Sequence, residues 1–296
     1  MKFLYLNKVD STNNYVAAHV GELSDMTMVI ARTQTAGRGQ RGNTWVSEPG
    51  KILTFTLLCR PEGVAVREHF AISEAVALAV ADCVEEILAD KRMLRVAVKW
   101  PNDVYVGDRK VAGILIEHSV TPARIEHSRI GVGVNVNQRD FGDGAPNAVS
   151  IASLAGLPET EELNLDSVAG KMAFHLERRL ESVSRGEAER AAIHREFLGR
   201  LWRFDGNCHR FKRRGEAMIF DGKILGVDPR GPIRVEDEAT GEASDYAFKE
   251  IEFIVEAESV SDNETDDMAV NRAGDNGPKM PDAPENPEVS APTPVS

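Results

Sequence analysis

One stretch constrains the fold of this chain more than any other: residues 37–45, which read Gly-Arg-Gly-Gln-Arg-Gly-Asn-Thr-Trp. Glycines let the backbone take positive φ angles and come close to a ligand, so that consecutive N–H groups can converge on an anion. Arginine adds a planar fork of donors that suits phosphate or carboxylate, and tryptophan adds a flat ring face. The sequence therefore predicts a loop that closes over an anionic ligand carrying a ring.

Two other interpretations of the glycines are open. Gly37, Gly39 and Gly42 satisfy the G-x-G-x-x-G pattern of dinucleotide-binding folds, and Glu62 stands where such a fold places its acidic residue. That pattern requires a helix directly after the glycines, whereas a polar segment and a strand-like run at 52–58 follow here. A plain hairpin turn would explain the glycines but not the arginines and the tryptophan beside them. We favour a ligand-binding loop between two strands.

Composition limits the kinds of partner. The 296 residues carry a formal net charge of −12, which argues against a nucleic-acid-binding surface over most of the chain. Residues 258–296 hold nine acidic and two basic residues among many prolines. We expect this segment to be a disordered tail, because it has too few apolar residues to offset the entropy of ordering.

Cysteine usage and hydropathy bear on the compartment. The three cysteines lie far apart, without metal-ligand spacing or a disulfide framework, which favours a reducing cytoplasm. The N-terminus has no long apolar region, and no run of about 18 apolar residues occurs anywhere. We therefore expect a soluble, cytoplasmic protein that contacts no membrane.

Hydrophobic periodicity predicts strands and helices in alternation. Strand-like runs occur at 3–6, 28–31, 52–59, 94–98 and 130–137, and helical periodicity at 15–20, 67–89, 165–184 and 187–202. A hairpin is expected at 104–117 around Gly107-Asp108, with Lys110 at the head of its second strand. Ser150 to Leu154 predicts a short helical turn. His69, near the start of the long helix, is interpreted as a surface histidine.

From about Asp205 the pattern changes to short alternating strands. Turns are expected at Gly215, Asp221-Gly222, Gly231-Pro232 and Gly241. About 50 residues of this kind predict a small barrel or sheet. Three segments are therefore expected: a main domain at 1–204, a small β domain at 205–257 and the tail at 258–296.

Polar groups that could act on a phosphate cluster near strand ends. Residues 99–103 read Lys-Trp-Pro-Asn-Asp, and the proline should present Asn102 and Asp103 in a fixed direction. Lysines and arginines can stabilise charge on a phosphoryl group, and Asp103 could hold a Mg²⁺ ion bound to phosphates. The sequence contains neither G-x-S-x-G nor a Walker A loop. These residues favour a transfer between two bound substrates, driven by positioning and electrostatics.

The chain resembles the biotin–protein ligases over residues 3 to 255. The motifs that carry the resemblance are Asp10-Ser11-Thr12-Asn13, the stretch Gly37 to Trp45, Lys99 to Asp103, Lys110 to Leu115, and Gly131 to Asn135. The family implies an α/β (α+β) fold, in which a mixed-sheet catalytic domain of the biotin/lipoate ligase type is followed by a small SH3-like β-barrel.

The resemblance also implies a role for each matched residue. The biotin-binding residues would be Ser11, Thr12, Asn13, Gln34, Gly37, Arg38, Gly39, Gln40, Lys110 and Gly113. The ATP-binding residues would be Arg41, Gly42, Trp45, Lys99, Trp100, Asn102, Asp103 and Asn135. Lys110, Arg38 and Asp103 would be catalytic, with Mg²⁺ on Asp103.

The implied reaction consumes ATP and biotin as substrates. Biotin's carboxylate attacks the α-phosphate of ATP to give biotinyl-5′-AMP and pyrophosphate, and a lysine of a biotin carboxyl carrier protein then attacks the acyl carbon. Many relatives have arginine where Gln40 stands, so the grip on the adenylate is expected to be weaker unless Arg41 compensates. The chain starts at the catalytic domain, so we expect a monofunctional enzyme without DNA binding. A homodimer is compatible with the resemblance.

Two alternatives come from the same residues. A lipoate or octanoate ligase or transferase of the same superfamily would need a pocket for an aliphatic chain, whereas the Ser-Thr-Asn cluster suits a ring with hydrogen-bonding edges. A biotin-sensing protein without catalysis would not need Lys110, Asp103 and both loop arginines.

Overall fold

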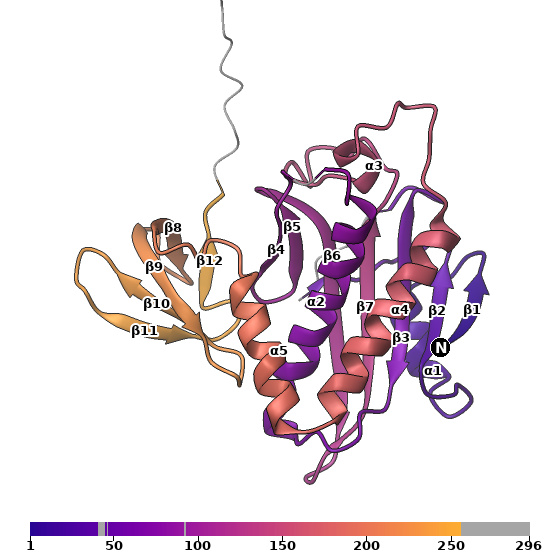
Figure 1. The fold of residues 1–296 in the computed structure, drawn as a ribbon, viewed down its shortest axis with the longest axis horizontal. Coiled ribbons are helices and arrows are strands. Elements are labelled where there is room, and N and C mark those ends of the chain that lie inside the picture. Colours follow the sequence, from indigo (N-terminus) through magenta and orange to yellow (C-terminus); the bar gives the residue numbers. More distant parts are fainter. Residues whose placement is uncertain (41–44, 46, 92, 256–296) are drawn as a thin grey trace, which may run out of the picture. The chain divides into compact units, whose positions relative to one another are not determined.

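A seven-stranded sheet in the order β1-β2-β3-β7-β6-β5-β4 forms the frame of the protein (Figure 1). The structure is a computed structural model, and it describes residues 1–40, 45, 47–91 and 93–255. The strands are β1 (Lys2–Leu6), β2 (Thr27–Ala31), β3 (Ile52–Cys59), β4 (Val96–Lys99), β5 (Asp103–Val106), β6 (Arg109–Val120) and β7 (Ile125–Asn135). β1 and β2 run parallel and every other neighbouring pair in this sheet is antiparallel.

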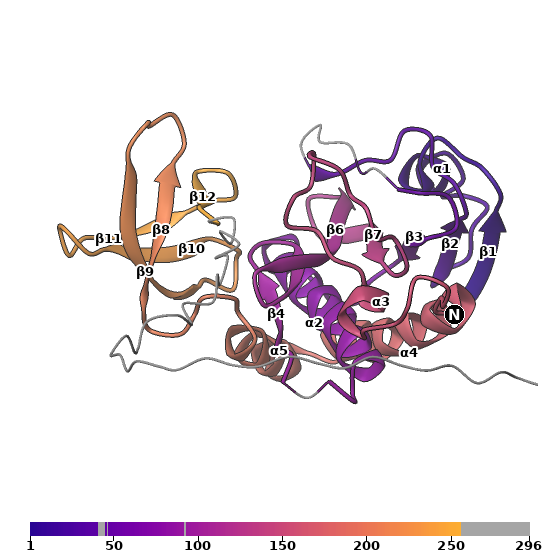
Figure 2. The same cartoon turned by 90° about the horizontal axis from the view of Figure 1, so that it is seen from above.

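Helices cover the two faces of this sheet unequally. Helix α2 (Phe70–Ile87) packs on α4 (Leu165–Ser184) and α5 (Glu187–Gly199), and all three lie on one face (Figures 1 and 2). The residues of α2 from Phe70 to Cys83 are almost all buried, because alanines alternate with larger apolar side chains and allow close packing. Helix α1 (Thr12–Ala18) packs on β3 and β7 at the opposite face, where much of the sheet is left for a ligand.

A second, smaller sheet follows α5. Its five strands are all antiparallel, in the order β11-β10-β9-β8-β12, and are consistent with an SH3-like domain. They are β8 (Cys208–Arg213), β9 (Ile219–Val227), β10 (Ile233–Asp237), β11 (Ala243–Tyr246) and β12 (Ile251–Phe253). The turn expected at Asp221-Gly222 is wrong. Gly222 lies inside β9 at a crowded position, where a Cβ would approach Val235 Cγ1 to 2.9 Å.

The other expected elements are confirmed with small shifts of their ends. The hairpin around Gly107 joins β5 to β6, and Gly107 takes the positive φ of 59° that the turn requires. Two short helices, η2 (Val66–Glu68) and α3 (Ile151–Leu154), complete the described elements. β7 begins earlier than expected, at Ile125. Among the described residues, none of the helices is both long and apolar enough to span a bilayer.

A buried ion pair joins α2 to α5. Glu74 is 1% exposed, and its Oε1 lies 2.6 Å from Nδ1 of His194. Burial raises the pKa of Glu74, while the hydrogen bond to Glu74 raises the pKa of His194. Because the folded pKa of His194 is raised, its stabilising contribution is fully present below about pH 6.5 and is lost as the pH rises through the raised value.

We expect His194→Ala to lower the free energy of unfolding by about 1–2 kcal/mol at pH 6, because the carboxyl group of Glu74 loses its buried partner. The difference from wild type should be smaller at pH 9. Urea unfolding of both proteins at the two pH values measures it. An equal difference at both would show that the proton on His194 contributes nothing.

Candidate active site

The floor of a pocket on the α1 face of the sheet is made of main chain. Gly131 and Gly133 lie on β7, and Gly133 pairs across the sheet with Gly113 of β6 and with Thr54 of β3. Gly131 is likewise opposite Thr56. Because glycines have no side chains, these positions leave a hollow between β3 and β6. The pocket lining consists of Ser11, Thr12, Asn13, Gln34, Arg38, Gly39, Gln40, Trp45, Thr54, Phe55, Thr56, Asn102, Asp103, Lys110, Gly113, Ile114, Leu115, Gly131, Val132 and Gly133.

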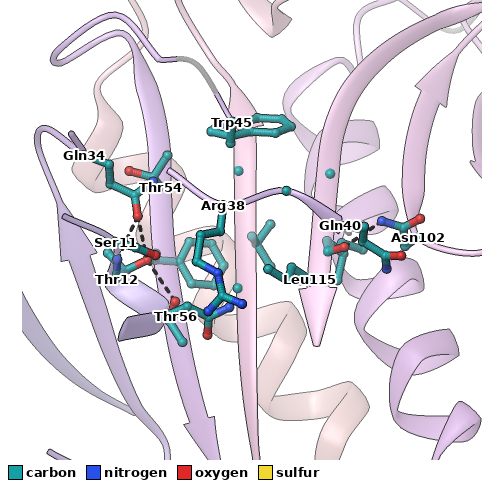
Figure 3. A pocket seen from close by; sticks show the side chains of 18 of the residues that line it. Ser11, Thr12, Gln34, Arg38, Gln40, Trp45, Thr54, Thr56, Asn102 and Leu115 are labelled. Atoms are coloured by element: carbon teal, nitrogen blue, oxygen red, sulfur yellow. Dashed lines mark hydrogen bonds between the residues drawn. The ribbon is translucent and has the colours of Figure 1, made fainter. Parts of the chain in front are cut away.

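One end of this pocket is a recess of neutral polar groups at the start of α1. The Oε1 atom of Gln34 accepts from the backbone N–H of Thr12 at 2.8 Å and from its hydroxyl at 3.1 Å. The hydroxyl of Thr56 donates to that of Thr12 at 2.9 Å, so the chain of hydrogen bonds continues into β3 (Figure 3). Ser11 is the N-cap residue, but its side chain makes no capping hydrogen bond. Asn13 Oδ1 is buried without a partner among the described residues.

The unused polar atoms of this recess are therefore available to a ligand. A buried, unpaired amide oxygen is costly, and a ligand N–H group would remove that cost. The recess offers amide and hydroxyl groups and contains no charged side chain among its described members, so it suits a neutral group with both donors and acceptors.

The glycine-rich loop is closed at its base by two hydrogen-bonded residues. The N–H of Trp45 donates to Gly37 O at 2.9 Å. The indole of Trp45 lies directly on the glycine floor, because a Cβ at Gly133 would be 2.4 Å from its Cε2 and one at Gly113 would be 2.8 Å from its Cζ3. Glycine is thus required at both positions by the close approach of the ring. The indole Nε1 is buried with no partner among the described residues.

Arg38 is held beside the pocket by a carboxylate of β6. Its guanidinium lies 3.0 Å from Glu117 Oε1, and it also donates to Asn14 Oδ1 at 3.1 Å. Glu117 in turn contacts Arg129 at 3.4 Å. Figure 3 shows Arg38 between the polar recess and the side where Gln40 lies next to Asn102.

The charged end of the pocket is a lysine–aspartate pair. Nζ of Lys110 lies 2.7 Å from Oδ1 of Asp103 and 5.6 Å from the centre of a Trp45 ring. A β-bulge positions this lysine, since Tyr105 pairs with Lys110 and Val104 with Ala112, so that one residue of β6 is skipped. The bulge interrupts the alternation of faces and brings Lys110 to the same side as Gly113.

Several residues predicted for the site do not line this pocket. Lys99 lies 5.2 Å from the centre of the Tyr105 ring and near the rings of Trp202 and Phe253, and burial lowers its pKa. Trp100 donates from Nε1 to Gly231 O at 2.8 Å. Asn135 donates from its side-chain amide to Lys110 O at 3.3 Å and so helps to fix the backbone of the lysine. Their assignment to ATP stays a prediction.

The remaining predicted residues divide into those in the pocket and those outside the described part of the chain. Arg41 and Gly42 are outside it. Gly37 forms the base of the glycine-rich loop. The predicted residues that line the pocket are Ser11, Thr12, Asn13, Gln34, Arg38, Gly39, Gln40, Trp45, Asn102, Asp103, Lys110 and Gly113. Sequence reasoning missed Thr54 and Thr56, because threonine in a buried strand is also explained by its β propensity. Asn102 links the turn after β4 to β6 by donating from its side-chain amide to Ile114 O at 2.7 Å.

Chemically, the pocket joins a neutral polar recess to a cation that faces an aromatic ring. A ligand that places a polar ring in the recess would bring its other end to Lys110, Arg38 and the loop. A lysine beside a carboxylate and an arginine can stabilise negative charge that develops when two anionic groups react.

Comparisons with known proteins show which family the chain resembles. The model of the biotin/lipoate A/B protein ligase family matches residues 5–135. The bifunctional ligase/repressor BirA of Escherichia coli is 32% identical over 234 residues, which is 78% of this chain and 68% of BirA. The biotin–[acetyl-CoA-carboxylase] ligase of Paracoccus denitrificans is 39% identical over 152 residues, 51% of this chain and 62% of that protein.

Solved structures show the same fold. The biotin protein ligase from Aquifex aeolicus in complex with biotin and ATP superposes with a TM-score of 0.67 at 23% identity, covering 85% of this chain and 97% of that one. The biotin protein ligase from Leishmania major with biotinyl-5-AMP gives a TM-score of 0.57 at 22% identity, over 83% of this chain and 98% of that one. The chain belongs to the biotin/lipoate A/B protein ligase family.

Proposed function

We propose that the protein is a biotin–protein ligase, which activates biotin with ATP to biotinyl-5′-AMP and transfers biotin to a lysine of a biotin carboxyl carrier protein. The observation that carries the proposal is the junction of the recess around Thr12 and Gln34 with Lys110 in one pocket. The recess matches the ureido edge of biotin, which has both N–H donors and a carbonyl acceptor. The cation stands where the carboxylate tail would meet a phosphate.

In this arrangement the residues act by positioning and by charge. The recess fixes the ring of biotin, and Lys110 lies between its carboxylate and the α-phosphate of ATP, which otherwise repel each other. Arg38 adds a second cation from the loop, and Trp45 offers its ring to the adenine. The carboxylate oxygen attacks phosphorus, and pyrophosphate leaves with the electrons of the broken P–O bond.

Asp103 fits a Mg²⁺ ion only in part. Its Oδ1 is buried and close to Lys110, and in the described part of the chain no three His, Cys, Asp or Glu side chains gather as a metal site. Mg²⁺ is commonly held by one or two carboxylates together with phosphate oxygens and water. We propose that Asp103 supplies the protein ligand and that the bound ion neutralises phosphate charge.

We also propose that the chain has two domains, a catalytic domain at 1–204 and a small β domain at 205–257. Its support is that α5 ends at Gly199 and β8 begins at Cys208, so the change of architecture falls between them. Segment 258–296 lies outside the described residues. The three cysteines are free thiols, which supports the cytoplasm as the place of action.

Exchange of labelled pyrophosphate into ATP tests the function. We expect exchange that depends on biotin. Exchange with lipoate or octanoate instead would support the lipoate-type alternative, and binding of biotin without any exchange would support the sensor. A biotin protein ligase-like protein of unknown function from Silicibacter has a similar fold, with a TM-score of 0.59 at 15% identity, so fold alone does not decide between these outcomes.

Gln40 gives a further prediction about the adenylate. A neutral amide holds phosphate less tightly than a guanidinium, so the enzyme should release some biotinyl-5′-AMP, which then labels exposed lysines of other proteins. We expect Gln40→Arg to reduce labelling of a bystander protein by up to roughly tenfold, if one charge-assisted hydrogen bond contributes about 1.5 kcal/mol. Wild type and variant are compared with biotin and ATP in the absence of carrier. Equal, low labelling in both would show that Gln40 does not loosen the loop.

A further inference from the structure

A second pocket adjoins the first and has different chemistry. Gln40, Asn102 and Ile114 line both pockets, so the two share a wall. Its volume is about 430 Å³, compared with about 60 Å³ for the first. Its other lining residues are His69, Phe70, Ser73, Trp100, Pro101, Ile116, His118, Arg230, Gly231, Pro232, Ala247 and Phe248. It is therefore bounded by α2, β6, the turn after β4 and two loops of the smaller sheet.

The walls of the second pocket are mostly apolar and aromatic. The rings of Trp100 and Phe248 meet edge to face, with their centres 6.1 Å apart. Among the described lining residues, Arg230 alone carries a full charge, and its guanidinium is bound to Asp228 at 2.8 Å. A polyphosphate needs several unengaged cations or N–H groups, so this lining is unsuited to it.

Two histidines meet in this pocket. Their ring centres lie 5.8 Å apart, and His69, interpreted from the sequence as a surface histidine, is half-buried. Nδ1 of His69 lies 3.1 Å from Val66 O, which can only accept a hydrogen bond, so Nδ1 is the donor of this pair. Burial and the neighbouring His69 hold the pKa of His118 at about 4, so His118 is neutral at pH 7.

We propose that the second pocket is the channel through which the acceptor lysine of the carrier protein reaches the acyl-adenylate. This inference rests on the proposed function. The four-carbon stem of lysine fits an apolar, aromatic channel, and an ammonium is attracted to aromatic faces and to neutral imidazole nitrogens. Because Gln40 and Asn102 line both pockets, an amine at the inner end of the channel would lie beside the pocket that is proposed to hold the adenylate.

The channel also favours the chemistry of the second step. A lysine that enters an apolar site without a carboxylate loses water, which lowers its pKa and makes the free amine available. The ammonium loses one proton, its nitrogen attacks the acyl carbon of biotinyl-5′-AMP, and AMP leaves with the electron pair of the broken C–O bond. The nitrogen loses its second proton as the amide forms, and both protons pass to solvent.

The test fills the channel after the protein has folded. Ser73 lines it from α2, and Ser73→Cys changes one atom of the side chain. Cys59 and Cys83 are buried, with their thiol pKa values raised by burial to about 12, and the exposed Cys208 is removed by Cys208→Ser. Benzyl methanethiosulfonate then places a ring in the channel, and dithiothreitol removes it. Wild type modified at Cys208 is the matched control.

Two rates are measured on the same protein: biotin-dependent pyrophosphate exchange, and transfer from added biotinyl-5′-AMP to a biotin carboxyl carrier domain. We expect modification to reduce transfer at least tenfold and to leave exchange within about twofold, with recovery of transfer after dithiothreitol. Unchanged transfer after complete modification would overturn the channel. A parallel loss of exchange would also overturn it, by assigning the space to the nucleotide. Absence of exchange in unmodified protein would instead reject the ligase function.

Discussion

Lys110→Ala is expected to slow formation of the acyl-adenylate by on the order of 100-fold or more. The lysine is the cation at the charged end of the pocket, with its Nζ 2.7 Å from Oδ1 of Asp103 and 5.6 Å from the centre of a Trp45 ring. Without it, two anionic groups must approach each other with less compensation, and the Asp103 carboxylate adds its own repulsion. Biotin-dependent pyrophosphate exchange at saturating biotin and ATP measures the effect.

Arg109→Ala is the matched control, because Arg109 is the exposed neighbour on the same strand. It should leave the exchange rate unchanged. Thermal unfolding of the Lys110 variant separates loss of catalysis from loss of fold. Near-normal exchange by Lys110→Ala would reject its catalytic role, and Lys99 would be the next residue to replace.

Gly133→Val should raise the KM for ATP roughly 30-fold. A Cβ at this position would lie 2.4–2.7 Å from three atoms of the Trp45 indole, so the ring must leave the floor. If the indole stacks on adenine, its loss removes about 2 kcal/mol, within the range measured for stacking of bases on aromatic side chains. Valine itself suits a β-strand, so the strand should persist. Biotin affinity should change less, because the recess lies at the other end of the pocket.

A double-mutant cycle tests this interpretation. Trp45→Ala should produce a similar increase in KM, and the double variant should show little more than either single change, since both act through the same ring. Additive effects would mean that Gly133 matters for a reason other than the indole. An unchanged KM in Gly133→Val would show that the adenine does not use this face of Trp45.

Much of the fold was predictable because its elements have strong periodicity. The run from Phe70 to Cys83 repeats apolar residues at helical spacing, and the hairpin at Gly107 has a turn that needs a positive φ. The strands of the smaller sheet were harder to predict, since a glycine inside a strand looks like a turn in sequence. Glycine is needed at position 222 because the side chain of Val235, on the next strand, leaves no space for a Cβ atom, and this contact cannot be read from the local sequence.

The site was predictable as a set of motifs but not as a geometry. Lys99 and Lys110 have equivalent contexts in sequence, each at a strand end beside a turn. The structure places Lys110 in the ligand pocket and Lys99 among three aromatic rings, because direction depends on the bulge in β6 and on the position of the smaller sheet. His69 and His118 are 49 positions apart, and their contact could not be read from spacing.

The bulge in β6 makes the number of residues between Lys110 and Gly113 as important as their identities. Inserting one residue there while the bulge is kept would turn the lysine toward the opposite face of the sheet, whereas deleting one would restore regular pairing with β5 and leave the lysine on the side of Gly113. Exchanges of Val111 or Ala112 for other small apolar residues keep that count. Single-residue insertions in this short segment should therefore be rarer among active sequences than substitutions.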